Sequence, residues 1–308
     1  MLYFLSDAHI GSRAIGYPAS EQSGVGVDDS QHQLRFVHML NTLAQDATAF
    51  YLLGDIFDFW SEYFWRDPSK QEFAPLLDCL KAITDKGIPV HYFIGNHDIW
   101  TYGWLARRTG VTIHRHGETL TIAGKRCMLA HGDGLVPTDY IRQFPKDIQR
   151  KIRSFMRLRA IFHNPVAQFF FRLVPPAWGN KFGYSWAKSS RLKELANPCP
   201  YKGENREELV LYAKEHELYN TQSSTAVRLN NTQLSTAVRL NNTQSTTAVR
   251  LTNTQPIDFY IFGHRHIELD LQLASGARVI ILGDCFRQWT YAAMTEQGEL
   301  QLLNFYEQ

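Results

Sequence analysis

Short apolar runs that end in aspartate, asparagine or histidine recur along this chain of 308 residues. The clearest is the run 49–53, which is followed by Gly54-Asp55-Ile56-Phe57-Asp58. A run of this length is typical of a buried parallel strand. The carboxyl ends of such strands form the ligand-binding edge of open α/β sheets. We therefore predict that Asp55 points into a site, although Gly-Asp also forms ordinary turns.

Four more predicted strands lead into similar motifs. The strands are 2–5, 90–94, 126–130 and 257–262. Their motifs are Ser6-Asp7-Ala8-His9, Gly95-Asn96-His97-Asp98, His131-Gly132-Asp133-Gly134 and Gly263-His264-Arg265-His266. Helices predicted from about residue 29 and over 71–86 alternate with the early strands, which favours a mostly parallel sheet. The C-terminal runs 269–273, 277–282, 290–294 and 300–305 predict a second, antiparallel sheet packed on the first.

Two segments do not fit this core. The segment 142–200 is basic and aromatic, and we interpret it as an inserted helical cap. The segment 220–255 repeats Thr-Ala-Val-Arg-Leu every eleven residues, and its many Asn, Thr, Gln and Ser residues disfavour helix. A surface loop is therefore favoured over a small solenoid. The predicted core consists of 1–141 and 256–308, with a core helix in 201–219.

Composition narrows the class of protein. The formal net charge of +2 argues against wholesale nucleic-acid binding. The four cysteines form no Cys-x-x-Cys pair, which predicts a reducing compartment and no zinc ribbon. The N-terminus lacks a basic region before its short apolar run, and no stretch reaches the roughly 18 apolar residues that span a bilayer. We therefore expect a cytoplasmic protein.

The strand-end side chains form one candidate metal centre. They are two aspartates, one asparagine and four histidines: Asp7, His9, Asp55, Asn96, His131, His264 and His266. Mixed imidazole and carboxylate ligands suit Mn, Fe or Zn better than Ca or Mg. Seven donors exceed the need of one tetrahedral ion, so we predict two ions that share a carboxylate and activate a water for attack on a phosphoryl group. A lone histidine is more often a structural residue, but five motifs at successive strand ends disfavour coincidence.

In their order, these motifs resemble the signature of the calcineurin-like metallophosphoesterases. The resemblance implies an α/β fold, a four-layer α-β-β-α sandwich with a two-metal site at one edge and manganese as the expected ion. It implies two ligand sets that share Asp55: Asp7, His9, Asp55 and His266 for one ion, and Asp55, Asn96, His131 and His264 for the other. It also implies that His97 acts near the leaving group or the phosphoryl oxygens and that Asp98 orients it. Asp58 could be a ligand, but a supporting role is favoured because Asp55 already supplies the bridge. Asp133 could be a general base, but a turn-forming role between Gly132 and Gly134 is favoured.

The predicted cap has a basic and an apolar face. A helix that begins at Pro145 places four cations on one face: Lys146, Arg150, Arg153 and Arg157. Such a face is typical of binding to an anionic membrane surface. The apolar run 166–174 suits an acyl-chain groove or the membrane interface. A helical lid with solvated charges is the alternative.

A cap of this kind resembles that of the UDP-2,3-diacylglucosamine diphosphatases. The resemblance implies hydrolysis of the diphosphate of UDP-2,3-diacylglucosamine, a lipid-linked nucleotide, to UMP and lipid X in lipid A synthesis. The expected location is the inner face of the cytoplasmic membrane, with substrate contacts from Lys188 and Arg191. The chain departs from that group at His97, where its best-known members have Arg. A soluble nucleotide phosphodiesterase or phosphoprotein phosphatase stays open as the alternative, and a non-catalytic scaffold is remote because every ligand position is filled.

Overall fold

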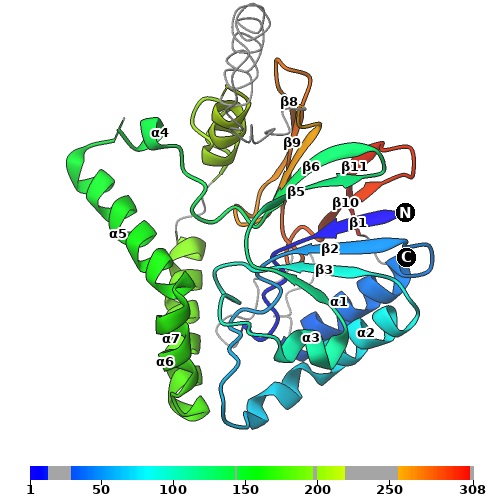
Figure 1. Cartoon of the computed structure of the whole chain (residues 1–308), viewed down its shortest axis with the longest axis vertical. Coiled ribbons are helices and arrows are strands. Elements are labelled where there is room, and N and C mark those ends of the chain that lie inside the picture. The colour runs from blue at the N-terminus through cyan, green and yellow to red at the C-terminus, as the bar shows by residue number, and fades with distance from the viewer. Residues whose placement is uncertain (13–28, 143, 197–199, 219–255, 306–308) are drawn as a thin grey trace, which may run out of the picture.

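The computed structural model describes residues 1–12, 29–142, 144–196, 200–218 and 256–305, and the repeat segment 220–255 lies outside these ranges. Two sheets pack face to face at the centre of the described part, and helices lie on their outer sides (Figure 1). A separate arm of helices projects from one side of this core.

The first sheet has the strand order β11-β10-β1-β2-β3-β4. Four of its strands run parallel: β1 (Leu2–Leu5), β2 (Ala49–Leu53), β3 (Val90–Phe93) and β4 (Thr112–His114). On the other side of β1 lie the antiparallel strands β10 (Thr290–Met294) and β11 (Leu300–Asn304). Leu5 pairs with Leu52, and Leu53 pairs with Phe93, so three motif-bearing strand ends meet at one edge.

The second sheet has the order β5-β6-β7-β9-β8. Its strands are β5 (Glu118–Ile122), β6 (Lys125–Ala130), β7 (Phe259–Phe262), β8 (Glu268–Gln272) and β9 (Arg278–Leu282). Two predictions were wrong here. The strand 126–130 pairs with β7 in the second sheet, and the strands at 290–294 and 300–305 extend the first sheet. Local periodicity does not encode the partner of a strand, and β10 satisfies the free backbone edge of β1.

Alternate side chains along each strand point to opposite faces of the sheet and therefore pack into different layers. Phe4 and Tyr51 of the first sheet pack with Phe259 and Ile261 of the second in a core between the sheets. The opposite face of the first sheet packs against α1 (Asp29–Leu43) and α2 (Ala74–Asp85), which follows the short helix η1 (Pro68–Phe73). A helix over 208–218 covers the outer face of the second sheet. The four-layer α-β-β-α sandwich is thus confirmed.

The described part of the segment predicted as a cap is mostly helical. It contains α5 (Lys146–His163), α6 (Pro165–Arg172) and α7 (Pro176–Ala196), which make up the projecting arm, and the short helix α4 (Thr138–Arg142) leads into it (Figure 1). The Asn164 side chain caps α6 by accepting hydrogen bonds from the backbone N–H groups of Val166 and Ala167. Among the described residues, no helix has the length and hydrophobicity needed to cross a bilayer.

Candidate metal centre

The backbone turns sharply where the strands deliver their motifs. Five non-glycine residues there have φ between 48° and 70°: Asp7, His9, Asp55, His264 and His266. A positive φ is uncommon for such residues and costs on the order of 1–3 kcal/mol each. The Asp7 N–H donates to the Gly54 carbonyl at 3.1 Å, and the His9 N–H donates to the Asp55 carbonyl at 2.9 Å. The β1 and β2 loops therefore hold each other in the strained conformation that turns these side chains together.

Close approach between the β2 and β3 loops requires glycine. A Cβ on Gly95 would lie 2.2 Å from the Asp55 Oδ1 atom, and a Cβ on Gly54 would lie 2.7 Å from the Gly95 nitrogen. Gly54 also has a φ of +85°, which favours glycine. Both glycines thus allow the Asp55 carboxylate to lie against the next loop.

The described residues contain three groups of potential ligand atoms, one of which consists of His9, Asp58 and His97. Asp7, His9 and His266 form the first group. The His266 Nε2 atom lies 3.0 Å from Asp7 Oδ1 and 3.2 Å from His9 Nε2. Asp7 and His9 are almost completely buried. Three potential ligand atoms therefore face one another in a small polar space.

Asp55, His131 and His264 form the second group. The His131 Nε2 atom lies 3.2 Å from Asp55 Oδ2 and 3.3 Å from Asn96 Oδ1. The same Asp55 oxygen lies 3.9 Å from His9 Nε2, so Asp55 stands between the two groups. The structure thus brings together all seven side chains that the sequence singled out, from β1, β2 and β3 of one sheet and β6 and β7 of the other.

A hydrogen bond behind the His131 ring fixes which of its nitrogens faces the site. The His131 Nδ1 atom donates to the Leu53 carbonyl at 2.8 Å, which leaves its Nε2 lone pair toward Asp55. The His9 Nδ1 atom lies 3.2 Å from the Asp58 carboxylate. Such orienting partners are typical of metal-binding histidines. The donors fit a pair of divalent cations. Asp58 lies in a group of potential ligands with His9 and His97, and its supporting role stays a prediction.

The protonation of the centre follows from burial and from neighbouring charges. Burial raises the pKa of Asp55, but the adjacent His131 and His97 imidazoles reverse this effect and hold it well below its usual range. Burial lowers the pKa of His131, and Asp55 more than compensates and raises it. Burial, together with His131, lowers the pKa of His264 to about 4. The Asp55 carboxylate thus stays charged because cationic partners face it, and a divalent ion satisfies the same requirement.

His97 lies beside the donor groups and is oriented by the backbone. Its N–H donates to Asp55 Oδ1 at 2.8 Å, and its Nδ1 donates to the Asp58 carbonyl at 2.5 Å. We expected Asp98 to orient this ring. The Asp98 carboxylate accepts hydrogen bonds from the Tyr92 hydroxyl and the Gly95 N–H, both at 2.6 Å. It therefore braces the loop, and its orienting role toward the His97 ring stays a prediction.

Two helices of the cap contact the motifs of the centre. On α7, the Trp186 ring lies 5.5 Å from the His97 ring, measured between centroids. On α5, Arg159 donates two hydrogen bonds to the buried carboxylate of Asp133. Burial raises the pKa of Asp133, but this guanidinium lowers it below its usual value. Asp133 thus joins the cap to the His131 loop.

The other predicted cap residues lie on the surface of the helices. The four α5 cations are all exposed: Lys146, Arg150, Arg153 and Arg157. Lys188 is an exposed residue of α7, and Arg191 belongs to the same helix with a side chain outside the described set. Their contacts with membrane or substrate stay predictions.

Replacing Arg159 with methionine is expected to lower the free energy of unfolding by about 2 kcal/mol, because the buried Asp133 carboxylate loses its partner. Urea denaturation measures this loss, and Arg153→Met on the exposed face of α5 is the control. Adding Asp133→Asn should recover part of the loss, since no buried charge then remains. Equal stability of the two single variants would contradict the importance of the ion pair.

Sequence reasoning missed three supporting residues. Arg159 and Trp186 touch the centre from the cap, and Glu207 accepts hydrogen bonds from Arg265, which stands between two predicted ligands. Glu207 is completely buried. Arg265 offered a signal because a cation between two ligand histidines needs a counter-charge. The cap residues offered none, because their partners are distant in sequence.

A paired cluster of imidazoles and carboxylates at the edge of a four-layer sandwich defines a metal-dependent phosphoesterase. The sequence model of the calcineurin-like phosphoesterases matches residues 2–268. The chain belongs to this family and is a metal-dependent hydrolase, and the family uses divalent metals.

One relative with a more specific name matches nearly the whole chain, and others of that name match about half of it. The chain is 30% identical over 301 residues to a protein of Porphyromonas gingivalis named UDP-2,3-diacylglucosamine hydrolase, covering 94% of this chain and 92% of that protein. A protein of the same name from Edwardsiella ictaluri is 27% identical over 59% of this chain and 64% of its own length. The protein of that name from Vibrio parahaemolyticus is 30% identical over 46% of this chain and 51% of its own length.

Proposed function

We propose that this enzyme hydrolyses the diphosphate of UDP-2,3-diacylglucosamine and releases UMP and the lipid monophosphate lipid X. In this proposal, Asp55 is shared by two ions, with Asp7, His9 and His266 on one side and Asn96, His131 and His264 on the other. Manganese is the proposed ion. The proposed site of action is the inner face of the cytoplasmic membrane, where exposed cations of α5 meet anionic lipid.

The observation that carries the proposal is the contact of the cap with the metal centre. Trp186 lies against His97, and Arg159 holds the loop that follows His131. The same arm exposes large apolar side chains, among them Phe182 at 69% and Trp186 at 39%. An acylated nucleotide needs an apolar wall beside its diphosphate, and this arm offers one. The name of the relatives that span the chain supports the same substrate.

In this proposal, some residues of the chain bind the metal ions and His97 stabilises charge on the phosphoryl group. Divalent ions at the centre would supply a water with a lowered pKa and would neutralise phosphoryl oxygens. His97, held through Nδ1 by the Asp58 carbonyl, would direct Nε2 to the phosphoryl oxygens. A phosphate leaving group needs little protonation, so His97 can act as a hydrogen-bond donor, as an Arg would. The strained, cross-braced loops keep the donors in place without reorganisation.

The dependence of turnover on the acyl chains of the substrate tests the proposal directly. Turnover with Mn²⁺ is measured on UDP-2,3-diacylglucosamine and on UDP-N-acetylglucosamine, which has the same diphosphate without the acyl chains. We expect kcat/KM to be at least about 100-fold higher for the acylated compound, because each buried methylene contributes about 0.8 kcal/mol. Equal values, or a preference for soluble phosphodiesters, would favour the soluble phosphodiesterase instead.

A further inference from the structure

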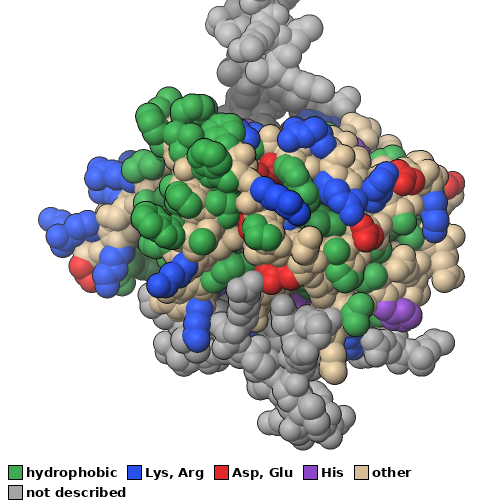
Figure 2. Space-filling model, turned by 90° about the horizontal axis from the view of Figure 1, so that it is seen from below, with side chains coloured by type: hydrophobic (Ala, Val, Ile, Leu, Met, Phe, Trp, Pro, Cys, Tyr) green, Lys and Arg blue, Asp and Glu red, His purple; other side chains and the backbone are tan. Residues whose placement is uncertain are grey.

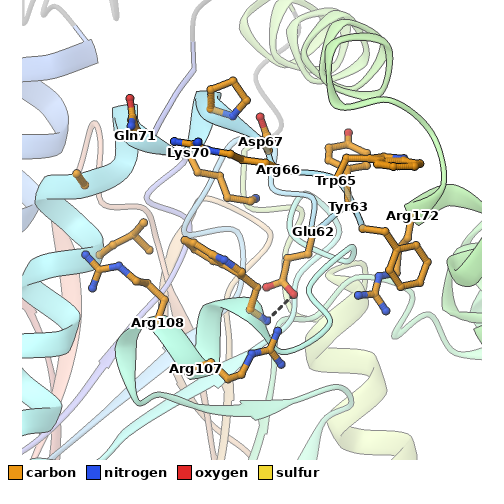
Figure 3. Close-up of a pocket in the computed structure, with 15 residues that line it drawn as sticks. Glu62, Tyr63, Trp65, Arg66, Asp67, Lys70, Gln71, Arg107, Arg108 and Arg172 are labelled. Atoms are coloured by element: carbon orange, nitrogen blue, oxygen red, sulfur yellow. Dashed lines mark hydrogen bonds between the residues drawn. The ribbon is translucent and has the colours of Figure 1, made fainter.

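A second cavity lies outside the metal centre, between the loop 62–67, η1 with α2, and α3 (Trp104–Thr109) (Figure 3). Its volume is about 620 Å³. Arg172, the last residue of α6, closes one side. None of the seven predicted ligands lines it. The cavity is therefore a separate feature of the surface.

Several cations that line this cavity form no ion pair with a carboxylate of the described residues. Figure 3 shows Lys70, Arg107 and Arg172 gathered around Glu62. Within the described residues, no ion pair joins Arg66, Arg107 or Arg172 to an acidic side chain. Arg108 is different, because it pairs with Asp78.

The two acidic side chains of the lining have other partners. Glu62 accepts hydrogen bonds from the backbone N–H groups of Tyr102 and Trp104, each at 2.7 Å, and of Leu105 at 2.8 Å. Asp67 caps η1 and accepts a hydrogen bond from the Asn180 side chain at 3.2 Å. These donors are neutral, so they hold the two acids in place without adding positive charge. The lining thus has a net excess of two positive charges, because two acids face four cations: Arg66, Lys70, Arg107 and Arg172.

Two of these cations are held in place by aromatic rings. The Arg172 guanidinium lies 4.0 Å from the centre of the Phe64 ring, and its buried Nε has no hydrogen-bond partner. Buried donors of this kind are rare without a ligand or solvent partner. The Lys70 ammonium lies 3.6 Å from the centre of the Trp60 ring, and burial lowers its pKa to about 8, so it is largely charged at pH 7. The cavity thus presents fixed positive charge.

The rim of the cavity is aromatic and exposed. Phe64 is 47% exposed and Trp65 is 58% exposed. The Phe64 ring lies 5.6 Å from Phe169 of α6, so the rim continues into the apolar surface of the arm. Figure 2 shows hydrophobic side chains gathered at one side of this view, with Lys and Arg around them. Arginine and aromatic side chains together suit an anion that carries an organic group.

We propose that this cavity is a second anion site, which binds a phosphate ester between Lys70, Arg107 and Arg172 with its organic part against Trp65 and Trp104. The ester is the headgroup of an anionic phospholipid or a soluble phosphorylated compound. The proposal does not depend on which substrate the metal centre hydrolyses.

The test compares two double variants that each remove two positive charges from exposed or half-buried positions. Arg107→Gln with Arg172→Gln changes the cavity, and Lys81→Gln with Lys125→Gln is the matched control. Binding is measured on phosphatidylglycerol vesicles, on phosphatidylcholine vesicles and by calorimetry with glycerol 3-phosphate. We expect wild type and control to bind a phosphate probe, and the cavity variant to bind it about tenfold or more weakly. Manganese-dependent hydrolysis of bis(p-nitrophenyl) phosphate should be the same in all three proteins, which shows that each is folded.

The probes identify the source of the ester. Binding to phosphatidylglycerol vesicles alone identifies a lipid headgroup, and binding of glycerol 3-phosphate identifies a soluble compound. The proposal is overturned if wild type binds neither probe, or if the cavity variant binds as tightly as the control.

Discussion

Replacing Asp55 with alanine is expected to abolish metal-dependent hydrolysis. One oxygen of this carboxylate lies between His131 and His9, and the other accepts the hydrogen bond of the His97 N–H. Its removal therefore eliminates a negative charge that both donor groups share. It also eliminates the hydrogen bond that holds the His97 loop. We expect the metal content to fall from two ions to one or none per chain, and turnover to fall at least about 1000-fold.

Elemental analysis after gel filtration measures the metal content, and a phosphodiester assay measures turnover. Asp85→Ala, which removes an exposed carboxylate at the end of α2, is the control and should keep both values. A melting curve of the Asp55 variant checks that the core is folded. An Asp55→Ala enzyme that keeps two ions and full turnover would refute the shared carboxylate.

Replacing His97 with alanine is expected to lower kcat about 100- to 1000-fold, the usual effect of losing one donor that stabilises developing charge. The metal content should stay at two ions, because His97 is not among the seven predicted ligands. His97→Arg should retain much more turnover than His97→Ala, since a guanidinium supplies the same kind of donor.

Two results would change this assignment. Loss of an ion from His97→Ala would make His97 a ligand, which its position near His9 and Asp58 allows geometrically. Unchanged kcat in both variants would remove His97 from the chemistry altogether. The two readings are separated by measuring metal content and kcat on the same preparation.

Local sequence pattern predicted the strand positions and the residues at their ends. Strands β1 and β2 begin and end where their apolar runs do, and all seven predicted donors meet in space. The assignment of strands to sheets was not predictable in this way, because β6 pairs with β7 across more than a hundred intervening residues. The hydrogen bonds that Asp98 makes were unpredictable for a related reason. Its hydrogen-bond partners depend on how closely Tyr92 and Gly95 approach it, which spacing along the chain does not reveal.

The pairing of β6 with β7 has a consequence for the synthesis of this chain. The last two predicted ligands, His264 and His266, directly follow β7, so the donor set is incomplete until the cap and everything after it have left the ribosome. The newly made N-terminal part thus holds only a partial set of donors and should capture metal weakly. Since closing a loop costs only about 0.6 kcal/mol more for each doubling of its length, the excursion between the two strands can lengthen over evolution at little thermodynamic cost.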